Sequence, residues 1–478
     1  MKIFQRSLLI AFIVFAVTLI AKENEKADNW PTWRGPASNG IAENASPPIE
    51  WSEEKNIKWK VKIPGSGHAT PVIWQDKIFV LTAVKTDKIF PRKAEGTSKG
   101  ERPRPKNGEK PPRPPRDVKK GEKPPEGKSS DGKKRKRRPR GVQPDDVLRY
   151  TVLALDRETG KVLWEHVAIE ATPHEGTHLD ATWASNSPIT DGEHLYAHFG
   201  SRGIFCYTLE GELVWQKDLG DMRTRRGFGE GSSPVLHGNT LVINWDHEEA
   251  SFIVALDKKT GDELWRDARD EPTSWSTPLI HIIDGKEQVI VSATNNVVGY
   301  DLKTGKRLWE SNGMTMNVIP TPIVYKDLLY VMSGFRGNAL QAIRMDGLSG
   351  DIKSTDAIAW EYNKDTPYVP SGVQYNGRLY FSKSNNAILT CLDATTGKPV
   401  YETQRLSGLG TIYASMLAAN GHVYITSKNG TTLVLKDGET FVVAATNKLD
   451  DFFSASPIAL GNSLFLRGAK NLYCISAN

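Results

Sequence analysis

ALDRETGKVLW, at residues 154–164, is the stretch of this sequence that decides the fold, because close copies of it recur along the chain. ALDKKTGDELW occupies residues 255–265, and GYDLKTGKRLW occupies residues 299–309. CLDATTGKPVY, at residues 391–401, ends in Tyr, and CYTLEGELVW, at residues 206–215, is a degenerate copy. A unit that returns at a nearly constant interval predicts a repeat architecture.

Each copy closes a longer unit that opens on Ser/Thr-Pro or a variant of it, followed by short apolar strands. The units start at Pro71, Pro188, Pro234, Pro278, Pro322, Gly372, Met416 and Pro457. Successive starts lie 41 to 50 residues apart, except that the first two are separated by 117 residues. Four short strands in each 40 to 50 residues are typical of a β-propeller blade. Alternating apolar positions in segments such as DKIFVLTAV and GRLYFSKS favour strands over helices.

The repeat also assigns structural roles to its signature residues. D-x-x-T-G predicts a hairpin turn in which Gly provides the backbone conformation. We expect the Trp at the end of each unit to pack its face against the neighbouring blade. Cys206, Cys391 and Cys474 share the repeat position of Ala154, a small-residue site on the third strand. They are therefore predicted to be buried structural thiols on three different blades, too far apart to form disulfides.

The two ends of the repeat region predict how the ring closes. The last unit stops after three strands and lacks the strand that carries Trp. NIKWKVKIP, at residues 56–64, precedes the first unit and carries Trp59. We predict that this segment completes the last blade and removes an exposed sheet edge. The expected fold is all-β: an eight-bladed β-propeller of four-stranded antiparallel blades at residues 56–476, after an N-terminal extension at residues 22–55.

Residues 1–21 have the features of a signal peptide. Lys2 and Arg6 form a basic start, a run of 15 nearly all apolar residues follows, and polar sequence comes next. This run is shorter than the roughly 20 apolar residues of a membrane-spanning helix. We therefore expect export to the periplasm or cell envelope, with no transmembrane span after cleavage. An uncleaved N-terminal anchor is the alternative.

The net charge of +6 conceals two different parts of the chain. Residues 88–140 hold 21 Lys/Arg and 7 Asp/Glu, a net charge of +14, which leaves −8 for the rest. The Pro-rich, apolar-poor composition predicts a disordered basic insertion at residues 88–146, within the first blade. We expect it either to contact anionic surfaces, such as lipid headgroups or acidic polysaccharide, or to be a solvated loop without function. Because the chain is predicted to be exported, we expect no nucleic-acid partner.

HEGTH, at residues 174–178, matches the H-E-x-x-H zinc motif, which requires a helix to bring both His side chains to one face. Pro173, Gly176 and a position between two blades predict a loop instead. The candidates for a looser metal site are His174, His178 and Asp180, and ordinary surface histidines are the alternative.

GFGEGSS, at residues 227–233, resembles a phosphate-binding Gly loop, but no βαβ unit surrounds it. We interpret its glycines as a tight turn into the third blade.

Segments that precede the inner strands of a propeller gather at one mouth of the central channel. Several of these segments are rich in Arg, acidic residues, His and Trp, and concave mouths with convergent polar groups are typical ligand sites. The candidates for a cofactor or ligand site there are Arg223, Arg225, Arg226, Glu230, Trp245, Asp246, His247 and Trp275. Salt bridges between ordinary loops are the alternative interpretation of the same residues.

The repeats resemble those of the quinoprotein-type propeller family, which includes the pyrroloquinoline quinone (PQQ) dehydrogenases and BamB. WPTWRGPASNG, at residues 30–40, with the HEGTH region, is similar to exported PQQ-like repeat proteins of planctomycete-type bacteria. The resemblance implies a propeller, and PQQ with calcium if the protein is an enzyme. The sequence has no adjacent Cys pair, no C-x-x-C-H haem motif and no calcium ligand set that can be matched to the dehydrogenases.

Three functional hypotheses follow from the repeats and this resemblance. The first is a non-catalytic binding or scaffold protein in the periplasm or cell envelope, whose partner is an envelope protein or a polysaccharide. The second is a PQQ- and Ca²⁺-dependent quinoprotein oxidoreductase acting on an alcohol or sugar. The third is a polysaccharide-binding module. The missing dehydrogenase motifs favour the first hypothesis over the second. The propeller fold does not decide among the three, because a fold by itself does not specify a function.

Overall fold

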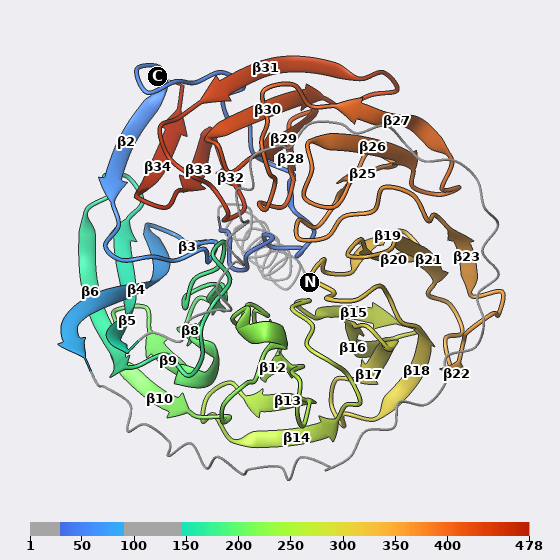
Figure 1. Ribbon diagram of the computed structural model, residues 1–478, viewed down its shortest axis with the longest axis horizontal. Helices are drawn as coiled ribbons and strands as arrows, with labels where there is room; N and C mark the ends of the chain where they lie inside the picture. The colour runs from blue at the N-terminus through green and yellow to red at the C-terminus, as the bar shows by residue number, and fades with distance from the viewer. Residues whose placement is uncertain (1–28, 90–144, 478) are drawn as a thin grey trace, which may run out of the picture.

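The computed structural model describes residues 29–89 and 145–477. Figure 1 shows their sheets arranged as blades around a central axis, with the first strand of each blade innermost. There are eight sheets, each built on four antiparallel strands, which confirms the predicted all-β eight-bladed propeller. The predicted signal peptide and most of the basic insertion lie outside the described residues. Within those residues, no helix has the length and apolar character needed to span a membrane.

The first four blades follow one another along the chain. Blade one contains β3 (Val72–Trp74), β4 (Lys77–Ile89), β5 (Asp146–Asp156) and β6 (Val162–Ala171), and blade two contains β7 (Ile189–Thr190), β8 (His194–His198), β9 (Ile204–Thr208) and β10 (Leu213–Lys217). Blade three contains β11 (Val235–His237), β12 (Thr240–Trp245), β13 (Phe252–Asp257) and β14 (Glu263–Ala268), and blade four contains β15 (Leu279–Ile283), β16 (Lys286–Ser292), β17 (Asn296–Asp301), β18 (Arg307–Asn312) and the added β22 (Gly350–Asp351). Residues at both ends of the predicted 88–146 insertion therefore belong to β4 and β5.

The last four blades complete the ring. Blade five contains β19 (Ile323–Tyr325), β20 (Leu328–Ser333), β21 (Ala339–Arg344) and β23 (Ile358–Glu361), and blade six contains β24 (Val373–Tyr375), β25 (Arg378–Ser382), β26 (Ile388–Asp393) and β27 (Pro399–Arg405). Blade seven contains β28 (Leu417–Ala419), β29 (His422–Thr426), β30 (Thr431–Lys436), β31 (Val442–Lys448) and the added β1 (Ile41–Ala42), and blade eight contains β32 (Ile458–Leu460), β33 (Ser463–Arg467), β34 (Asn471–Ser476) and β2 (Ile57–Lys62). Two short 3-10 turns, η1 (Gly200–Arg202) and η2 (Arg225–Gly227), are the remaining helical elements of the part described.

The D-x-x-T-G segments form hairpin turns, and terminal Trp residues pack on these turns in the neighbouring blade, as predicted. Asp156 accepts hydrogen bonds from the Thr159 backbone N–H at 2.7 Å and its hydroxyl at 2.6 Å, which fixes the turn. Gly160 has a φ of +71°, and a Cβ there would lie 2.8 Å from the ring of Trp59 on the adjacent blade. The same ring donates from Nε1 to the carbonyl of Arg157 at 3.1 Å. Equivalent hydrogen bonds to the next blade are made by Trp164, Trp215, Trp265 and Trp360.

Trp309 departs from this pattern. Its Nε1 donates to Gln288 of its own blade at 2.8 Å, and its ring covers Gly299 of the same blade. The neighbouring fifth blade has no D-x-x-T-G turn between β21 and β23 to receive the ring, because residues 345–357 form a longer connection there. Trp309 therefore lacks the hydrogen bond to the next blade, although it lies in one hydrophobic cluster with Leu329 and Val331 of blade five.

The predicted closure of the ring is confirmed. β2 pairs antiparallel with β34, and Trp59 lies opposite Cys474 in the register. In the same register position of their own blades, Cys206 lies opposite Trp215 and Cys391 lies opposite Tyr401. All three cysteines are free and buried, in agreement with the prediction of structural thiols.

Eight Ser and Thr side chains form a hydrogen-bonded circle around the axis, one at the second position before each inner strand. They are Thr70, Ser187, Ser233, Thr277, Thr321, Ser371, Ser415 and Ser456. In seven of the eight links, a backbone N–H donates to the hydroxyl oxygen of the next blade, at 2.9 to 3.1 Å. The eighth link has the opposite sense, because the Thr321 hydroxyl donates to the Thr277 carbonyl at 2.8 Å. The Ser/Thr of the repeat's opening motif therefore joins every blade to the next.

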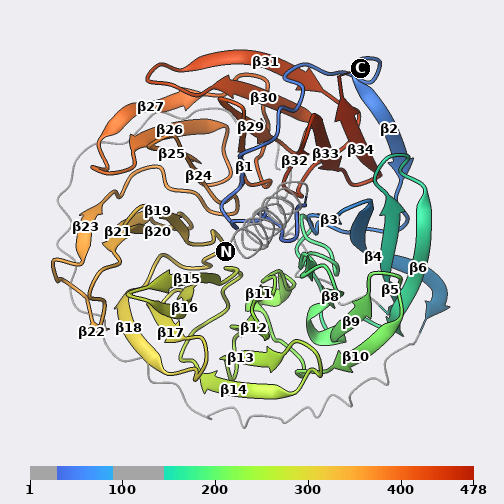
Figure 2. The ribbon, with the colours of Figure 1, turned by 180° about the vertical axis from the view of Figure 1, so that it is seen from behind.

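The N-terminal segment at residues 29–51 ties distant blades together. Trp30 bridges to Ile73 of blade one, and buried Arg34 donates to the Gly372 carbonyl of blade six at 2.6 Å. β1 then pairs in parallel with β28 of blade seven. Figure 2 shows this segment, in blue, running from near the centre of the ring past β1.

Candidate functional site at the channel mouth

A cavity of about 440 Å³ lies on the axis, within the range of about 300–1,000 Å³ that is usual for ligand pockets. The connection before each blade contributes one equivalent residue to the cavity wall. Each of these eight residues stands two positions before the Ser or Thr of the hydroxyl circle. They are His68, Ser185, Gly231, Trp275, Ile319, Val369, Tyr413 and Ser454. The repeat thus places eight equivalent positions around one cavity, and their side chains determine its chemistry.

Two long connections form one side of the cavity. Residues 172–188, before blade two, and residues 218–234, before blade three, each comprise 17 residues, whereas the other connections between blades comprise 9 to 11. The two connections interlock: His178 donates its backbone N–H to the Phe228 carbonyl at 3.1 Å. Glu175 accepts the Thr224 N–H at 3.1 Å. Their additional lining residues are His178, Asp180, Ala181, Phe228, Gly229 and Glu230.

The aromatic residues of the wall have their polar atoms engaged by the protein. Trp275 donates Nε1 to the Gly229 carbonyl at 2.7 Å, and the Tyr413 hydroxyl donates to Asp180 at 3.0 Å. Tyr368 accepts a hydrogen bond from Asn317 at 3.4 Å and stacks on Phe335, with ring centroids 4.6 Å apart. Because their orientations are fixed in this way, these side chains form a rigid aromatic part of the cavity wall. The Lys428 ammonium group lies over the Tyr413 ring, 4.9 Å from its centroid.

Asp180 links the segment at residues 172–188, before blade two, to blade seven on the other side of the cavity. One carboxylate oxygen forms an ion pair with Lys428, and the other accepts the Tyr413 hydroxyl. Partial burial opposes ionisation of Asp180, but Lys428 and Tyr413 outweigh it and lower the carboxyl pKa. Asp180 is therefore ionised at neutral pH, with its charge compensated by Lys428.

His68 and Glu230 have strongly shifted pKa values. Burial, assisted by the charges of Lys428 and Arg467, lowers the pKa of His68 to about 4, so its imidazole is neutral at pH 7. Burial raises the pKa of Glu230 to about 7, even though Ser201 donates both its backbone N–H and its hydroxyl to the carboxyl. Desolvation dominates both shifts, as expected for titratable groups in a partly enclosed site.

The structure brings only some of the predicted site residues to the cavity. Glu230, Trp275, His178 and Asp180 line it. His174 instead borders a separate water-sized cavity and pairs with Asp221 at 3.0 Å. The three predicted metal ligands therefore do not converge. Within residues 29–89 and 145–477, one group of three potential ligands lies within 4.8 Å: Asp191, Glu193 and His194.

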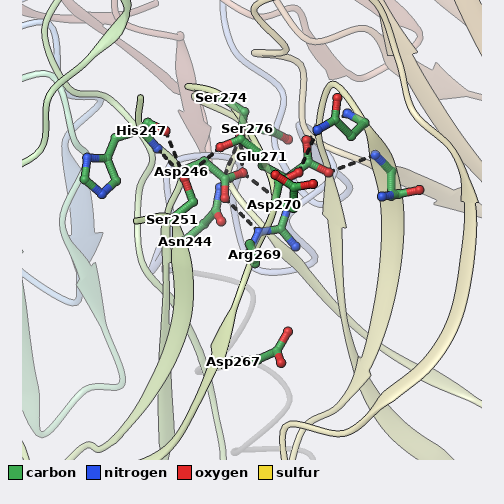
Figure 3. A network of polar contacts seen from close by, with 12 residues as sticks. Asn244, Asp246, His247, Ser251, Asp267, Arg269, Asp270, Glu271, Ser274 and Ser276 are labelled. Atoms are coloured by element: carbon green, nitrogen blue, oxygen red, sulfur yellow. Dashed lines mark hydrogen bonds and ion pairs between the residues drawn. The ribbon is translucent and has the colours of Figure 1, made fainter. Parts of the chain in front are cut away.

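Trp245, Asp246 and His247 are buried inside blade three and do not line the cavity. Asp246 forms an ion pair with Arg269 at 2.7 Å and accepts the Ser274 hydroxyl at 2.6 Å, within the network shown in Figure 3. Trp245 stacks on Phe252. The prediction that these three residues line the channel mouth is wrong. Asp246 and His247 lie in the loop between β12 and β13, where they bind groups of the connections before blades three and four.

The three predicted arginines stand at the edge of the site. Arg223 and Arg226 are exposed and Arg225 is half-buried, all at or beside η2, and none of them lines the cavity. Sequence reasoning missed His68, Phe228, Phe335, Tyr368 and Tyr413. A signal for two of them is present: His68 and Tyr413 stand two residues before a Ser or Thr that opens a repeat, as Trp275 does.

Comparisons with known proteins agree with the fold. The family model "Outer membrane protein assembly factor BamB" matches residues 149–346. The protein of that name from Francisella salina is 27% identical over 178 residues, which cover 36% of this chain and 30% of the relative. The match therefore spans less than a third of the relative's length.

Two solved structures share the propeller. BamB from Moraxella catarrhalis superposes with a TM-score of 0.50 and 14% identity, over 68% of this chain and 91% of the other. A europium-containing methanol dehydrogenase gives a TM-score of 0.60 with 10% identity, over 94% of this chain and 92% of the other. The likeness to planctomycete-type proteins stays a prediction. The comparisons support a PQQ-like propeller whose repeats at residues 149–346 are similar to those of the BamB family.

Proposed function

We propose that this protein is a binding or scaffold propeller of the cell envelope and that its ligand occupies the axial cavity. The observation that carries the proposal is the construction of the cavity from all eight blades, with fixed aromatic faces. Its two carboxyl groups are already engaged: Asp180 with Lys428, and Glu230 with Ser201. Such an arrangement favours holding a ligand over activating one for reaction.

The envelope location rests on two features. The first is the predicted signal peptide at residues 1–21. The second is the similarity to a protein named as an outer membrane assembly factor. The scaffold part of the proposal rests on the same similarity, since a propeller offers a broad rigid surface around its ligand site.

The alternative is a PQQ- and Ca²⁺-dependent oxidoreductase acting on an alcohol or sugar, and the fold shared with the methanol dehydrogenase favours it. PQQ is a tricarboxylate, and Ca²⁺ takes about six to eight oxygen ligands. The described lining contains no Arg or Lys, and both of its carboxyl groups are engaged by protein partners. These residues do not fit the cofactor pair, and the proposed function therefore includes no step that uses it.

The proposal is tested by screening the full chain for binding with Trp fluorescence and thermal shift. The panel contains neutral saccharides, organic cations and organic anions, including PQQ with Ca²⁺. We expect saturable binding of at least one compound. Ser185→Trp, which fills the cavity, should abolish it, and Leu264→Ala on exposed β14 should leave it unchanged.

Two outcomes would contradict the proposal. The first is that no compound binds the wild-type chain. The second is that Ser185→Trp binds as well as the wild type. Oxidation of an alcohol or sugar by the PQQ-loaded protein would establish the alternative instead.

A further inference from the structure

We infer that the ligand of the axial cavity is a neutral saccharide, an inference that rests on the function proposed above. The first observation is the combination of surfaces in the wall. Trp275, Tyr368 and Tyr413 are aromatic residues of this wall, and hydrogen bonds at their polar atoms fix their orientation. A sugar ring has an apolar C–H face that can lie against such a surface, while its hydroxyl groups point outward.

The second observation is a set of polar groups placed between these rings. The two imidazoles, His68 and His178, each engage the backbone of Asp180 through one ring nitrogen. In a neutral imidazole, the other nitrogen is the complementary donor or acceptor. The Ser454 hydroxyl lies on the same wall. Groups that can both donate and accept hydrogen bonds suit sugar hydroxyls, which do the same.

The third observation is the balance of charge. Asp180 and Glu230 are the carboxyl groups of the wall, and Lys428 and Arg467 are the cations whose charge reaches His68. Asp180 pairs with Lys428, and the raised pKa of Glu230 leaves that group about half protonated at pH 7. The lining side chains therefore carry little uncompensated charge, although the nearby buried Arg467 guanidinium, which does not line the cavity, has no hydrogen-bond partner among the described residues. A neutral ligand loses the least hydration energy on entering such a wall.

These observations separate three classes of ligand. An organic anion needs an Arg or Lys directed into the cavity, and none lines it within the described residues. An organic cation in an aromatic cage gains from uncompensated carboxylates, but the Asp180 carboxylate is neutralised by Lys428. A neutral saccharide uses both the ring faces and the uncharged polar groups, and needs no charged partner.

The test compares disaccharides of similar shape and different charge, by isothermal titration calorimetry with the full chain at pH 7. N,N′-diacetylchitobiose, maltose and cellobiose are the neutral probes. The dimer of glucosamine is the cationic counterpart, and digalacturonate is the anionic one. We expect a neutral probe to bind at least tenfold more tightly than either charged one.

Two variants locate the binding site. Trp275→Ala should weaken binding of the neutral probe at least tenfold, and Trp275→Phe, which keeps a ring face, should weaken it less. Leu264→Ala serves as the control remote from the cavity, and thermal melting shows whether each variant is folded. Equal affinity of Trp275→Ala and the wild type for the neutral probe would overturn the inference.

The outcomes distinguish this inference from the proposed function. If a charged compound of the broader panel binds in the cavity and the neutral disaccharides do not, the saccharide inference is wrong and the binding function stands. If no compound of either panel binds, both are wrong. Tight binding of a neutral disaccharide that Ser185→Trp abolishes supports both.

Discussion

The backbone N–H of Ser456, in the last blade, donates to the Oγ1 atom of Thr70, in the first, at 2.9 Å. This hydrogen bond closes the hydroxyl circle next to the axis. At the outer side of the same last blade, β2 pairs with β34 and places Trp59 opposite Cys474. The two ends of the repeat are therefore joined at both the inner and the outer side of the last blade, and β2 covers the edge that β34 would otherwise expose.

The hydroxyl circle should contribute measurably to stability. Thr70→Val keeps the side-chain shape but removes the acceptor for the Ser456 N–H, which is buried. A buried donor left without a partner costs about 1–3 kcal/mol. We expect the free energy of unfolding, measured by urea denaturation, to fall by that amount. Thr395→Val, at an exposed position, is the control and should change it by less than about 0.5 kcal/mol. Equal stabilities of the two variants would contradict this role of the circle.

Trp59 should matter to stability as much as the Trp residues inside the repeat. Trp59→Ala removes a ring that covers Gly160 and donates to the Arg157 carbonyl. Trp360 makes the matching contacts with Gly397 and Thr395 between blades five and six. We expect each Trp→Ala change to lower the free energy of unfolding by about 3–5 kcal/mol. If Trp59→Ala costs less than about 1 kcal/mol, the seam is not closed by this contact in solution.

Periodicity made the blades predictable, and departures from it made the site harder to predict. The register that pairs Tyr380 with Cys391 repeats in each blade, so one alignment located all three cysteines. The sequence predicts Asp246 at the channel mouth because its segment is rich in acidic residues, His and Trp, but this segment connects β12 and β13 and does not precede an inner strand. The partner of Asp246, Arg269, occurs in one blade alone and carries no repeat signal. The repeat could not reveal that pair.

The aromatic wall was missed for a related reason. Phe228 belongs to a long connection whose course depends on its contacts with the other long connection, such as the His178 hydrogen bond to the Phe228 carbonyl. Phe335 lies between the second and third strands of blade five and reaches the cavity by stacking on Tyr368 of the next connection. Neither contact has a counterpart in the other blades from which it could have been inferred.

Asp180 should hold the connection at residues 172–188 in place over the cavity. Asp180→Asn keeps an acceptor for the Tyr413 hydroxyl but loses the charge that pairs with Lys428. We expect faster amide hydrogen exchange across this connection, and faster association and dissociation of the cavity ligand.

The matched control for this prediction is Asp191→Asn. It breaks an ion pair with Lys258, 2.7 Å in length, outside the cavity. It should leave both the exchange of residues 172–188 and the ligand kinetics unchanged. Similar effects of the two substitutions would show that Asp180 has no special part in positioning the connection.

The buried Asp246–Arg269 pair should stabilise blade three only while both partners are present. Burial alone would lower the pKa of Arg269, but the Asp246 carboxylate outweighs it and raises that pKa. Asp246→Asn leaves the buried guanidinium uncompensated and should cost about 3–5 kcal/mol in urea denaturation.

Removing both charges, with Asp246→Asn and Arg269→Met together, should cost less than Asp246→Asn alone. Asp267→Asn, which breaks the more exposed pair with Arg307, should cost less than about 1 kcal/mol. A double variant that is less stable than Asp246→Asn would show that the network depends on hydrogen bonds of Arg269 other than those to Asp246, such as its bond to the Tyr300 hydroxyl.

Glu230 should make stability fall as the pH rises from about 4.5 to 7. Its pKa is raised from 4.5 in the unfolded chain to about 7 in the folded protein, chiefly by burial. A raised carboxyl pKa favours folding below the unfolded value, and that contribution is lost as the pH passes through the folded value. The lowered pKa of His68, about 4, acts in the opposite direction, since its contribution is present above pH 6.5 and lost toward pH 4. The wild-type profile therefore combines opposing slopes, and a variant must separate them.

Glu230→Gln isolates the carboxyl contribution. Its amide can accept the Ser201 N–H and donate to the Ser201 hydroxyl, so the local hydrogen bonds can be retained. Relative to the wild type, the variant should gain stability between pH 5 and pH 8, by up to about 3 kcal/mol. Urea denaturation at intervals across this range measures the difference. A constant difference between the two proteins would mean that Glu230 does not titrate in this window, because a group that keeps the same charge in both states adds no pH dependence to folding.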